Sequence, residues 1–265
     1  MLEKNTPIQF SHSNGFPASS YQHFFKLLAP YPVTAVERFG MGKYQIKNDW
    51  KPLVAELIDD IESKHSKPVI GVGHSLGGVL TAWAAIERPD LFAKIIFIDP
   101  PLFRPFKRFV MRSASLMGIT DKVVPPARST KKRRSVFESK EQAYELWKHK
   151  KLFKNFDDQC FQDYVEYGLS PSAKGVELII PPNLEYKIFT LTPAIIGSAD
   201  FSMPSYFLYS GKLKTVEAKD LAWLKKKFKK TQFMPYDGGH MYPMEEPEKA
   251  AGLIKGLINS PDALG

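Results

Sequence analysis

The chain has 265 residues, of which 43% are hydrophobic and 25% charged, ordinary values for a folded domain that exclude a long disordered or fibrous protein. Its single cysteine, Cys160, excludes an intramolecular disulfide framework. Most of the formal charge of +9 falls in residues 102–190, which hold 17 Lys or Arg and 10 Asp or Glu. No nucleic-acid-binding motif surrounds the basic run at 131–134, so a solvated basic face is favoured over a nucleic-acid site.

Strand and helix patterns alternate at both ends of the chain. Short apolar runs indicate strands, and apolar residues at helical spacing indicate amphipathic helices. In chain order the predicted elements are a strand at 8–12, a helix at 21–28, a strand at 33–39, a helix at 49–65, a strand at 68–74, a helix at 76–87, strands at 94–98 and 205–209, a helix at 216–228, a strand at 231–235 and a helix at 246–259. This order is typical of an α/β fold with a mostly parallel sheet covered on both faces.

The alternation stops between residues 102 and 190, where the sequence is basic and aromatic with a helical pattern at 140–154. We therefore predict an α/β core formed by 1–101 and 191–265, and a helical cap inserted at 102–190. Aromatic residues of the cap, such as Phe106, Phe109, Phe153 and Phe156, could line an acyl pocket or form the core of the cap itself.

A serine stands between a predicted strand and a predicted helix, in Gly73-His74-Ser75-Leu76-Gly77. A nucleophile at such a turn needs strained backbone angles, and the flanking glycines let neighbouring chains approach closely while the hydroxyl stays exposed. The alternative is a glycine-rich turn without chemistry. Ser75 is the candidate nucleophile.

An activated serine needs a general base and donors for the developing oxyanion. His240 follows the last predicted strand in a Gly-Gly-His loop, from which it could reach the carboxyl edge of the sheet, so we predict it to be the base. Backbone N–H groups of Phe16, in the loop after the first strand, and of Leu76, directly after the nucleophile, are the candidate oxyanion donors. A plain Gly-Phe-Pro turn is the alternative for Phe16.

These motifs resemble the α/β-hydrolase superfamily, specifically its lipase- and esterase-like branch with a lid insertion. The matching residues are Ser13-Asn14-Gly15-Phe16-Pro17, Arg38-Phe39-Gly40-Met41-Gly42, Gly73 to Gly78, and Gly239-His240 followed by Pro243, Glu245 and Pro247. The resemblance implies an α/β-hydrolase fold and a Ser-His-acid mechanism. Only seven residues precede Ile8, so we expect an N-terminally trimmed sheet of about six strands.

The acid of the triad departs from the commonest family pattern, because Gly211-Lys212-Leu213-Lys214 places a lysine where an aspartate usually stands. Asp99, at the carboxyl end of the strand after the nucleophile helix, is the preferred replacement, since some members of the superfamily supply the acid from that place. Asp200 is the alternative acid. Glu37, Asp237 or the lack of any acid remain open.

The leading functional hypothesis is a serine hydrolase that cleaves carboxylic esters of small to medium acyl substrates through an acyl-enzyme. Other chemistry on the same fold is an alternative, namely thioester, amide or carbon–carbon hydrolysis or cofactor-free oxygenation. A catalytically impaired binding protein is the third hypothesis, motivated by Lys214.

No metal or cofactor motif is found, so no cofactor is expected. The expected partner is a small-molecule acyl substrate and no nucleic acid, and the basic cap would favour anionic substrates or surfaces. The first residues do not resemble a signal peptide and no stretch has the length of a transmembrane segment, which predicts a cytoplasmic protein. The oligomeric state is not predicted.

Overall fold

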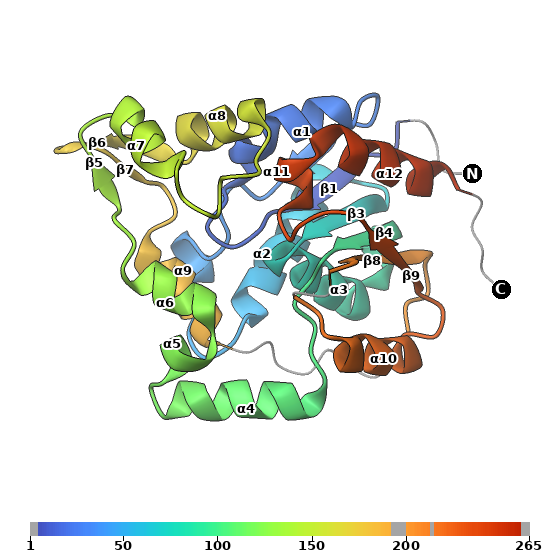
Figure 1. Cartoon of the computed structure of the whole chain (residues 1–265). Helices are drawn as coiled ribbons and strands as arrows, with labels where there is room; N and C mark the ends of the chain where they lie inside the picture. The colour runs from blue at the N-terminus through green and yellow to red at the C-terminus, as the bar shows by residue number, and fades with distance from the viewer. Residues whose placement is uncertain (1–4, 192–199, 213–214, 261–265) are drawn as a thin grey trace.

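A six-stranded parallel sheet forms the centre of the molecule (Figure 1). The structure, a computed structural model, describes residues 5–191, 200–212 and 215–260. The strand order within these residues is β2-β1-β3-β4-β8-β9, with bounds β1 Ile8–Ser11, β2 Val33–Ala35, β3 Val69–His74, β4 Phe92–Ile98, β8 Ser205–Ser210 and β9 Gln232–Tyr236. The predicted α/β fold with a sheet of about six strands is therefore confirmed.

Helices cover both faces of the sheet. Successive residues of β4 point to opposite faces, so that Ile96 and Ile98 belong to one hydrophobic cluster while Ile95 and Phe97 belong to the other. The helices of the first face are α1 Gln22–Leu27 and α12 Pro247–Asn259, and those of the second are α2 Lys51–Lys64, α3 Leu76–Glu87 and α10 Ala218–Lys227. No helix in the described ranges is long and apolar enough to cross a membrane.

The strand order reverses between β1 and β3. From β1 the chain runs outward to β2, then returns to the other side of β1 and continues through β3, β4, β8 and β9. Parallel sheets bind ligands outside the carboxyl ends of the strands at such a reversal. The loop after β1 and the turn at Ser75 after β3 both begin there.

The strand β2 is shorter than the predicted strand at 33–39. After Ala35 the chain leaves the sheet, and its backbone binds side chains instead: the Phe39 N–H donates to His12 Nε2 at 3.3 Å and the Gly40 N–H donates to Glu56 Oε2 at 2.7 Å. The apolar pattern of this segment therefore reflects burial in a loop.

Residues 102–190 contain the predicted helices and, in addition, three short strands that the sequence did not indicate. Their elements are α4 Pro105–Leu116, α5 Thr120–Val123, α6 Pro125–Lys131, β5 Val136–Phe137, α7 Lys140–Trp147, α8 Asp158–Tyr167, β6 Leu169–Ser172, β7 Gly175–Leu178 and α9 Pro182–Thr190. The strands β5, β7 and β6 form a small antiparallel sheet. A turn at residues 173–174 joins β6 to β7, and Gly175, the first residue of β7, has φ +113°. The division into core and cap stays a prediction.

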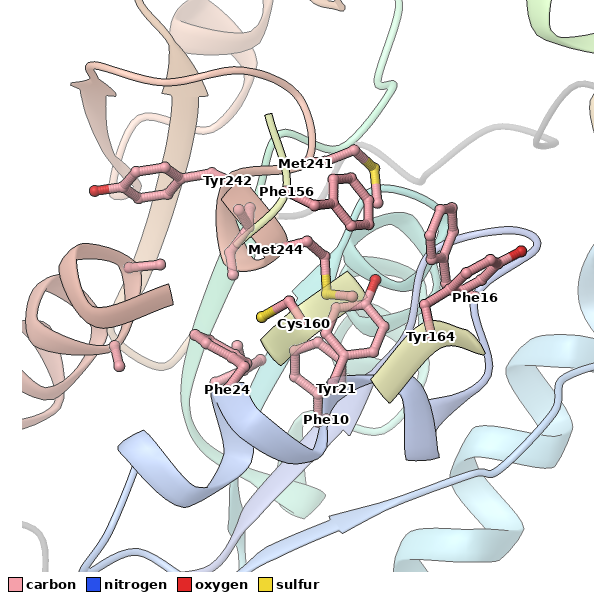
Figure 2. Packing of buried hydrophobic residues seen from close by; sticks show 14 of the residues in the cluster. Phe10, Phe16, Tyr21, Phe24, Phe156, Cys160, Tyr164, Met241, Tyr242 and Met244 are labelled. Atoms are coloured by element: carbon pink, nitrogen blue, oxygen red, sulfur yellow. The ribbon is translucent and has the colours of Figure 1, made fainter. Parts of the chain in front are cut away.

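Aromatic residues of this segment have two different environments. Tyr164 of α8 and Phe156 are buried and pack against Phe16 (Figure 2), with 4.7 Å between the ring centroids of Phe16 and Tyr164. Phe153 is buried beside the same rings. Phe106 and Phe109 are exposed on α4. The first group forms a core that holds α8 on the loop after β1.

The turn after β3 depends on close backbone contact. A Cβ atom on Gly77 would lie 1.9 Å from the carbonyl oxygen of Ser11, whereas one on Gly252 in α12 would meet nothing within 4 Å. We expect Gly77→Ala to lower the free energy of unfolding by at least about 2 kcal/mol. The matched Gly252→Ala should leave it unchanged or raise it by about 1 kcal/mol, because alanine is the better helix former. Urea unfolding of both variants tests this, and equal stability of the two would contradict the described contact.

Candidate active site

Ser75 lies at a strained turn between β3 and α3. Its φ of 53° and ψ of −115° lie outside the regions that non-glycine residues favour. The Ser75 N–H donates to the Ile98 carbonyl at 2.9 Å, and a Cβ on Gly73 would lie 2.4 Å from the Gly77 carbonyl oxygen. The local sequence therefore fixes the serine in the geometry expected of a nucleophile elbow.

Ser75, His240 and Asp99 form one chain of hydrogen bonds. The Ser75 Oγ lies 2.9 Å from His240 Nε2, and His240 Nδ1 lies 2.6 Å from Asp99 Oδ2. The three residues follow β3, β9 and β4, whose carboxyl ends share one edge of the sheet. This arrangement suits an imidazole that donates from Nδ1 to the carboxylate and accepts from the serine hydroxyl at Nε2.

Asp99 is buried, with 1% of its surface exposed, and has a φ of 46°. Its N–H donates to the Leu208 carbonyl at 2.8 Å, and its Oδ1 accepts a 3.4 Å hydrogen bond from the Ser210 N–H. Burial opposes ionisation of the carboxyl, but the hydrogen bond and positive charge of His240, with donors on Thr215 and Ser210, outweigh it and hold the pKa of Asp99 below its ordinary value. Asp99 is therefore a carboxylate at neutral pH.

Thr215 is a site residue that the sequence analysis missed. Its Oγ1 lies 3.0 Å from His240 Nδ1, and its hydroxyl also binds Asp99. The only available signal was its place directly after Gly211-Lys212-Leu213-Lys214, where the resemblance led us to expect an acid. Lys214 itself lies outside the described residues, so the structure does not describe that departure from the family pattern.

The other carboxylates considered lie away from His240. Asp200 accepts hydrogen bonds from the N–H groups of Phe201 and Lys230, at 3.2 and 3.1 Å. These residues precede β8 and β9, at the amino edge of the sheet, whereas His240 follows β9 at the carboxyl edge. Glu37 binds the hydroxyl of Ser19 at 2.5 Å. Within the described ranges, His240 has no hydrogen bond to Asp200, Glu37 or Asp237.

The two predicted oxyanion donors, the N–H groups of Leu76 and Phe16, differ in their hydrogen bonding. Leu76 is the first residue of α3, so its N–H has no acceptor inside the helix, and the positive end of the helix dipole lies there. The Phe16 N–H donates a 3.2 Å hydrogen bond to the carbonyl of Ser13 in its own loop. Gly15, with φ +80°, allows the tight turn that brings the Phe16 N–H to the Ser13 carbonyl.

Two further histidines, His74 and His12, are buried and form hydrogen bonds at this edge of the sheet. His74 donates from Nε2 to the His240 carbonyl at 2.8 Å and accepts at Nδ1 from the Tyr21 hydroxyl at 2.8 Å, while that hydroxyl accepts from the Ser13 N–H at 3.3 Å. His12 binds the Ser13 carbonyl through Nδ1 at 2.8 Å. These hydrogen bonds connect the loop after β1, the serine turn and the His240 loop.

The pKa values of these buried groups predict how stability depends on pH. Burial lowers the pKa of His74 to about 3 and that of His12 to about 4, and burial raises the pKa of Glu56 to about 7. Below about pH 6.5 the two histidines bind protons in the unfolded chain but not in the folded one, so they lower the stability as pH falls. Above about pH 4.5 Glu56 keeps its proton in the folded protein but loses it in the unfolded chain. Glu56 therefore raises the stability as pH falls.

With two histidines against one glutamate, we expect the free energy of unfolding to fall by about 1 kcal/mol per pH unit between about pH 6.5 and 4.5. Glu56→Gln removes the opposing group, so the fall should steepen to about 3 kcal/mol per unit. Urea unfolding at pH 7, 6 and 5 measures both slopes. Flat profiles for the two proteins would contradict the neutral state of His12 and His74.

The basic run at 131–134 is only partly a solvated face. Arg133 is half-buried and forms a 2.7 Å ion pair with Glu185 of α9, and it also binds the Tyr164 hydroxyl. The Glu185 carboxylate covers Gly15, where a Cβ atom would lie 2.9 Å from it, and its backbone carbonyl accepts from Asn14 Nδ2 at 3.0 Å. The prediction of a solvated face was wrong for Arg133, since this residue holds Glu185, which in turn contacts the loop after β1.

No group of three or more His, Cys, Asp or Glu side chains in the part of the chain that the structure describes could hold a metal ion. The arrangement found is a serine hydroxyl, an imidazole and a buried carboxylate joined by hydrogen bonds.

Comparison with known proteins gives a family and several related folds. The family model of the alpha/beta hydrolase family matches residues 10–253. A search of curated proteins by sequence gives no significant match.

Similar solved structures include the following three. E-2-(acetamidomethylene)succinate hydrolase is 17% identical with a TM-score of 0.77, over 97% of this chain and 92% of that chain. The thioesterase domain from the curacin biosynthetic pathway is 16% identical with a TM-score of 0.72, over 96% and 92%. A marine microorganism esterase is 16% identical with a TM-score of 0.64, over 96% of both chains. At these identities the likeness establishes the fold and leaves the substrate open.

Proposed function

The chain belongs to the α/β-hydrolase family, and from this premise we propose that it is a serine hydrolase of carboxylic esters with small to medium acyl groups. The observation that carries the proposal is the continuous hydrogen-bond chain from Ser75 through His240 to Asp99. The buried carboxylate of Asp99 lies 2.6 Å from His240 Nδ1, where it can orient the imidazole and stabilise the imidazolium. We assign the catalytic roles of nucleophile, base and acid to these three residues in that order.

In the acylation step His240 Nε2 takes the proton of the Ser75 hydroxyl while Oγ bonds to the acyl carbon. The carbonyl π electrons move to the oxygen and form a tetrahedral oxyanion. The oxyanion then collapses, the bond to the alkoxy group breaks, and the imidazolium of His240 donates its proton to the leaving alcohol. In the second half water attacks the acyl-enzyme by the same route and releases the acid and free Ser75.

The oxyanion is stabilised in this proposal by the N–H groups of Leu76 and Phe16. The Leu76 N–H needs no rearrangement, because α3 begins at that residue. The Phe16 N–H has a long hydrogen bond to a neutral carbonyl, and a charged oxygen is the stronger acceptor of the two. In comparable sites each donor lowers the activation barrier by about 3 kcal/mol.

Activity on a substrate panel separates ester hydrolysis from the alternatives. We expect turnover of p-nitrophenyl esters from acetate to octanoate, with acyl-CoA thioesters, anilides and β-diketones slower by about tenfold or more. The thioesterase among the similar structures makes the thioester arm the informative comparison. Faster turnover of acyl-CoA would replace ester hydrolysis by thioester hydrolysis as the proposed reaction. No turnover of any substrate class by folded protein would favour the binding-protein hypothesis.

The predicted cytoplasmic location stays a prediction, which cell fractionation checks.

A further inference from the structure

The helix α4 turns its apolar side to the solvent. Phe106, Phe109 and Leu116 are 68%, 67% and 81% exposed, and Val110 and Met117 are also exposed. These positions recur at the three- and four-residue spacing that places side chains on one helical face. Isolated exposed apolar residues are common, but a stripe of four on one helix, continued by Met117 at its C-cap, marks an interaction surface.

Polar contacts on the opposite side of α4 fix this orientation. Lys107 Nζ forms ion pairs with Glu217 and Asp220, at 2.8 and 3.4 Å, and Arg108 packs over the ring of Trp223. Asp220 is fully buried and also accepts from the Arg104 N–H at 3.1 Å. The helix α4 lies at the edge of the molecule (Figure 1). Because Lys107 and Arg108 are held against α10, the exposed apolar residues of α4 face away from it.

The surroundings of the stripe are strongly basic. Residues 105–134, from α4 to the end of the basic run, hold nine Lys or Arg and one acidic residue, Asp121, a net charge of +8 within a chain whose total is +9. The exposed Arg112 lies on α4 between Phe109 and Leu116, and the exposed Lys122 is next to the exposed Val123. A surface that combines apolar side chains with cations has the chemistry of amphipathic segments that bind anionic lipid headgroups.

We propose that α4 and the basic segment up to residue 134 form a docking surface for an anionic lipid bilayer, with the apolar stripe inserted between headgroups and the cations on the phosphates. A second copy of this chain is disfavoured as the occupant, because two surfaces that each expose six Lys or Arg side chains would face each other. A nucleic acid would meet the cations but leave the phenylalanines without an apolar partner. This surface does not depend on the proposed catalytic activity.

Flotation with large unilamellar vesicles tests the proposal on the full chain. Vesicles of phosphatidylcholine alone are compared with vesicles that contain one quarter phosphatidylglycerol, at low and at high salt. We expect at least about tenfold stronger binding to the anionic vesicles, and a loss of binding as salt rises.

Two double variants separate the contributions of the stripe and the charges. Phe106→Ser with Phe109→Ser, and Arg112→Glu with Lys122→Glu, should each weaken binding by about tenfold or more. The matched controls are Leu146→Ser with Leu152→Ser, which removes exposed leucines elsewhere, and Lys47→Glu with Lys51→Glu, which reverses exposed charges elsewhere. Controls should bind as the unchanged protein does, and all four variants should keep the circular dichroism spectrum and their activity on a water-soluble ester.

Several outcomes would overturn the docking surface. Folded protein that ignores anionic vesicles, equal binding to both vesicle types, or test variants that bind like their controls each exclude it. A concentration-dependent dimer that is lost in the Phe106 and Phe109 variant, without vesicle binding, would assign the stripe to self-association. Tighter binding to an oligonucleotide than to anionic vesicles would assign the cations to nucleic acid.

Discussion

Replacement of Ser75 by alanine is expected to lower kcat for p-nitrophenyl ester hydrolysis by about 10⁴- to 10⁶-fold. The reason is that alanine has no oxygen to attack the acyl carbon, so the acyl-enzyme route is lost and only binding and oxyanion stabilisation remain. KM should change by no more than about threefold, because the alanine removes no contact outside the reacting atom. Steady-state kinetics with enough enzyme to detect the residual rate measures both constants.

A serine elsewhere in the same hydrogen-bond network is the control for Ser75. Ser13 lies in the loop after β1, and its contacts to His12 and Tyr21 are made by its backbone. Ser13→Ala should therefore retain kcat within about threefold, since no backbone group is removed. If Ser75→Ala kept more than a tenth of the original kcat, Ser75 would not be the nucleophile.

Replacement of Asp99 by asparagine is expected to lower kcat by about 10⁴-fold. The buried carboxylate accepts the Nδ1 proton of His240, whereas an asparagine amide donates to Nδ1 and stabilises the tautomer with the proton on Nε2. An imidazole in that tautomer cannot take the proton of Ser75. The fold should change little, because the amide has the same shape as the carboxyl, and a thermal unfolding scan checks this.

Asp200→Asn is the matched control, since it makes the same chemical change at the second acid considered. Its carboxylate binds the backbone of Phe201 and Lys230, so the variant should keep kcat within about twofold and lose at most some stability. A loss of 10³-fold or more in Asp200→Asn, with an active Asp99→Asn enzyme, would reverse the assignment of the acid.

The parallel sheet and the order of its elements could be predicted from sequence because apolar runs buried on both faces repeat along the chain. Local patterns failed where tertiary contacts decide the backbone. Val36 and Phe39 extend the apolar pattern past Ala35 and resemble a strand, yet the N–H groups of Phe39 and Gly40 donate to His12 and Glu56. The strand β5 pairs with β7 across the intervening helices α7 and α8, β6 pairs with β7 in a hairpin, and the sequences of all three carry no strong alternation.

The candidate site could be predicted in part because each of its residues follows a strand, and parallel strands end at one edge. His240 was named on that ground, Ser75 because of its glycine-flanked turn, and Asp99 because of the resemblance to the superfamily. The hydrogen bonds run from Ser75 to His240 and from His240 to Asp99. Thr215 could not be found, because a hydroxyl that supports an acid has no sequence signature. The pairing of Arg133 with Glu185 was also hidden, since a buried ion pair and a solvated basic run have the same composition.

The most direct test of the central claim is to locate a fluorophosphonate label by mass spectrometry after digestion. Labelling traps the serine that the base activates, and therefore reports nucleophile and base together. We predict one adduct per chain, on Ser75, with a labelling rate reduced by about 10³-fold or more in His240→Ala. An adduct on another residue, or equal labelling rates in the unchanged protein and His240→Ala, would contradict the assignment of Ser75 and His240.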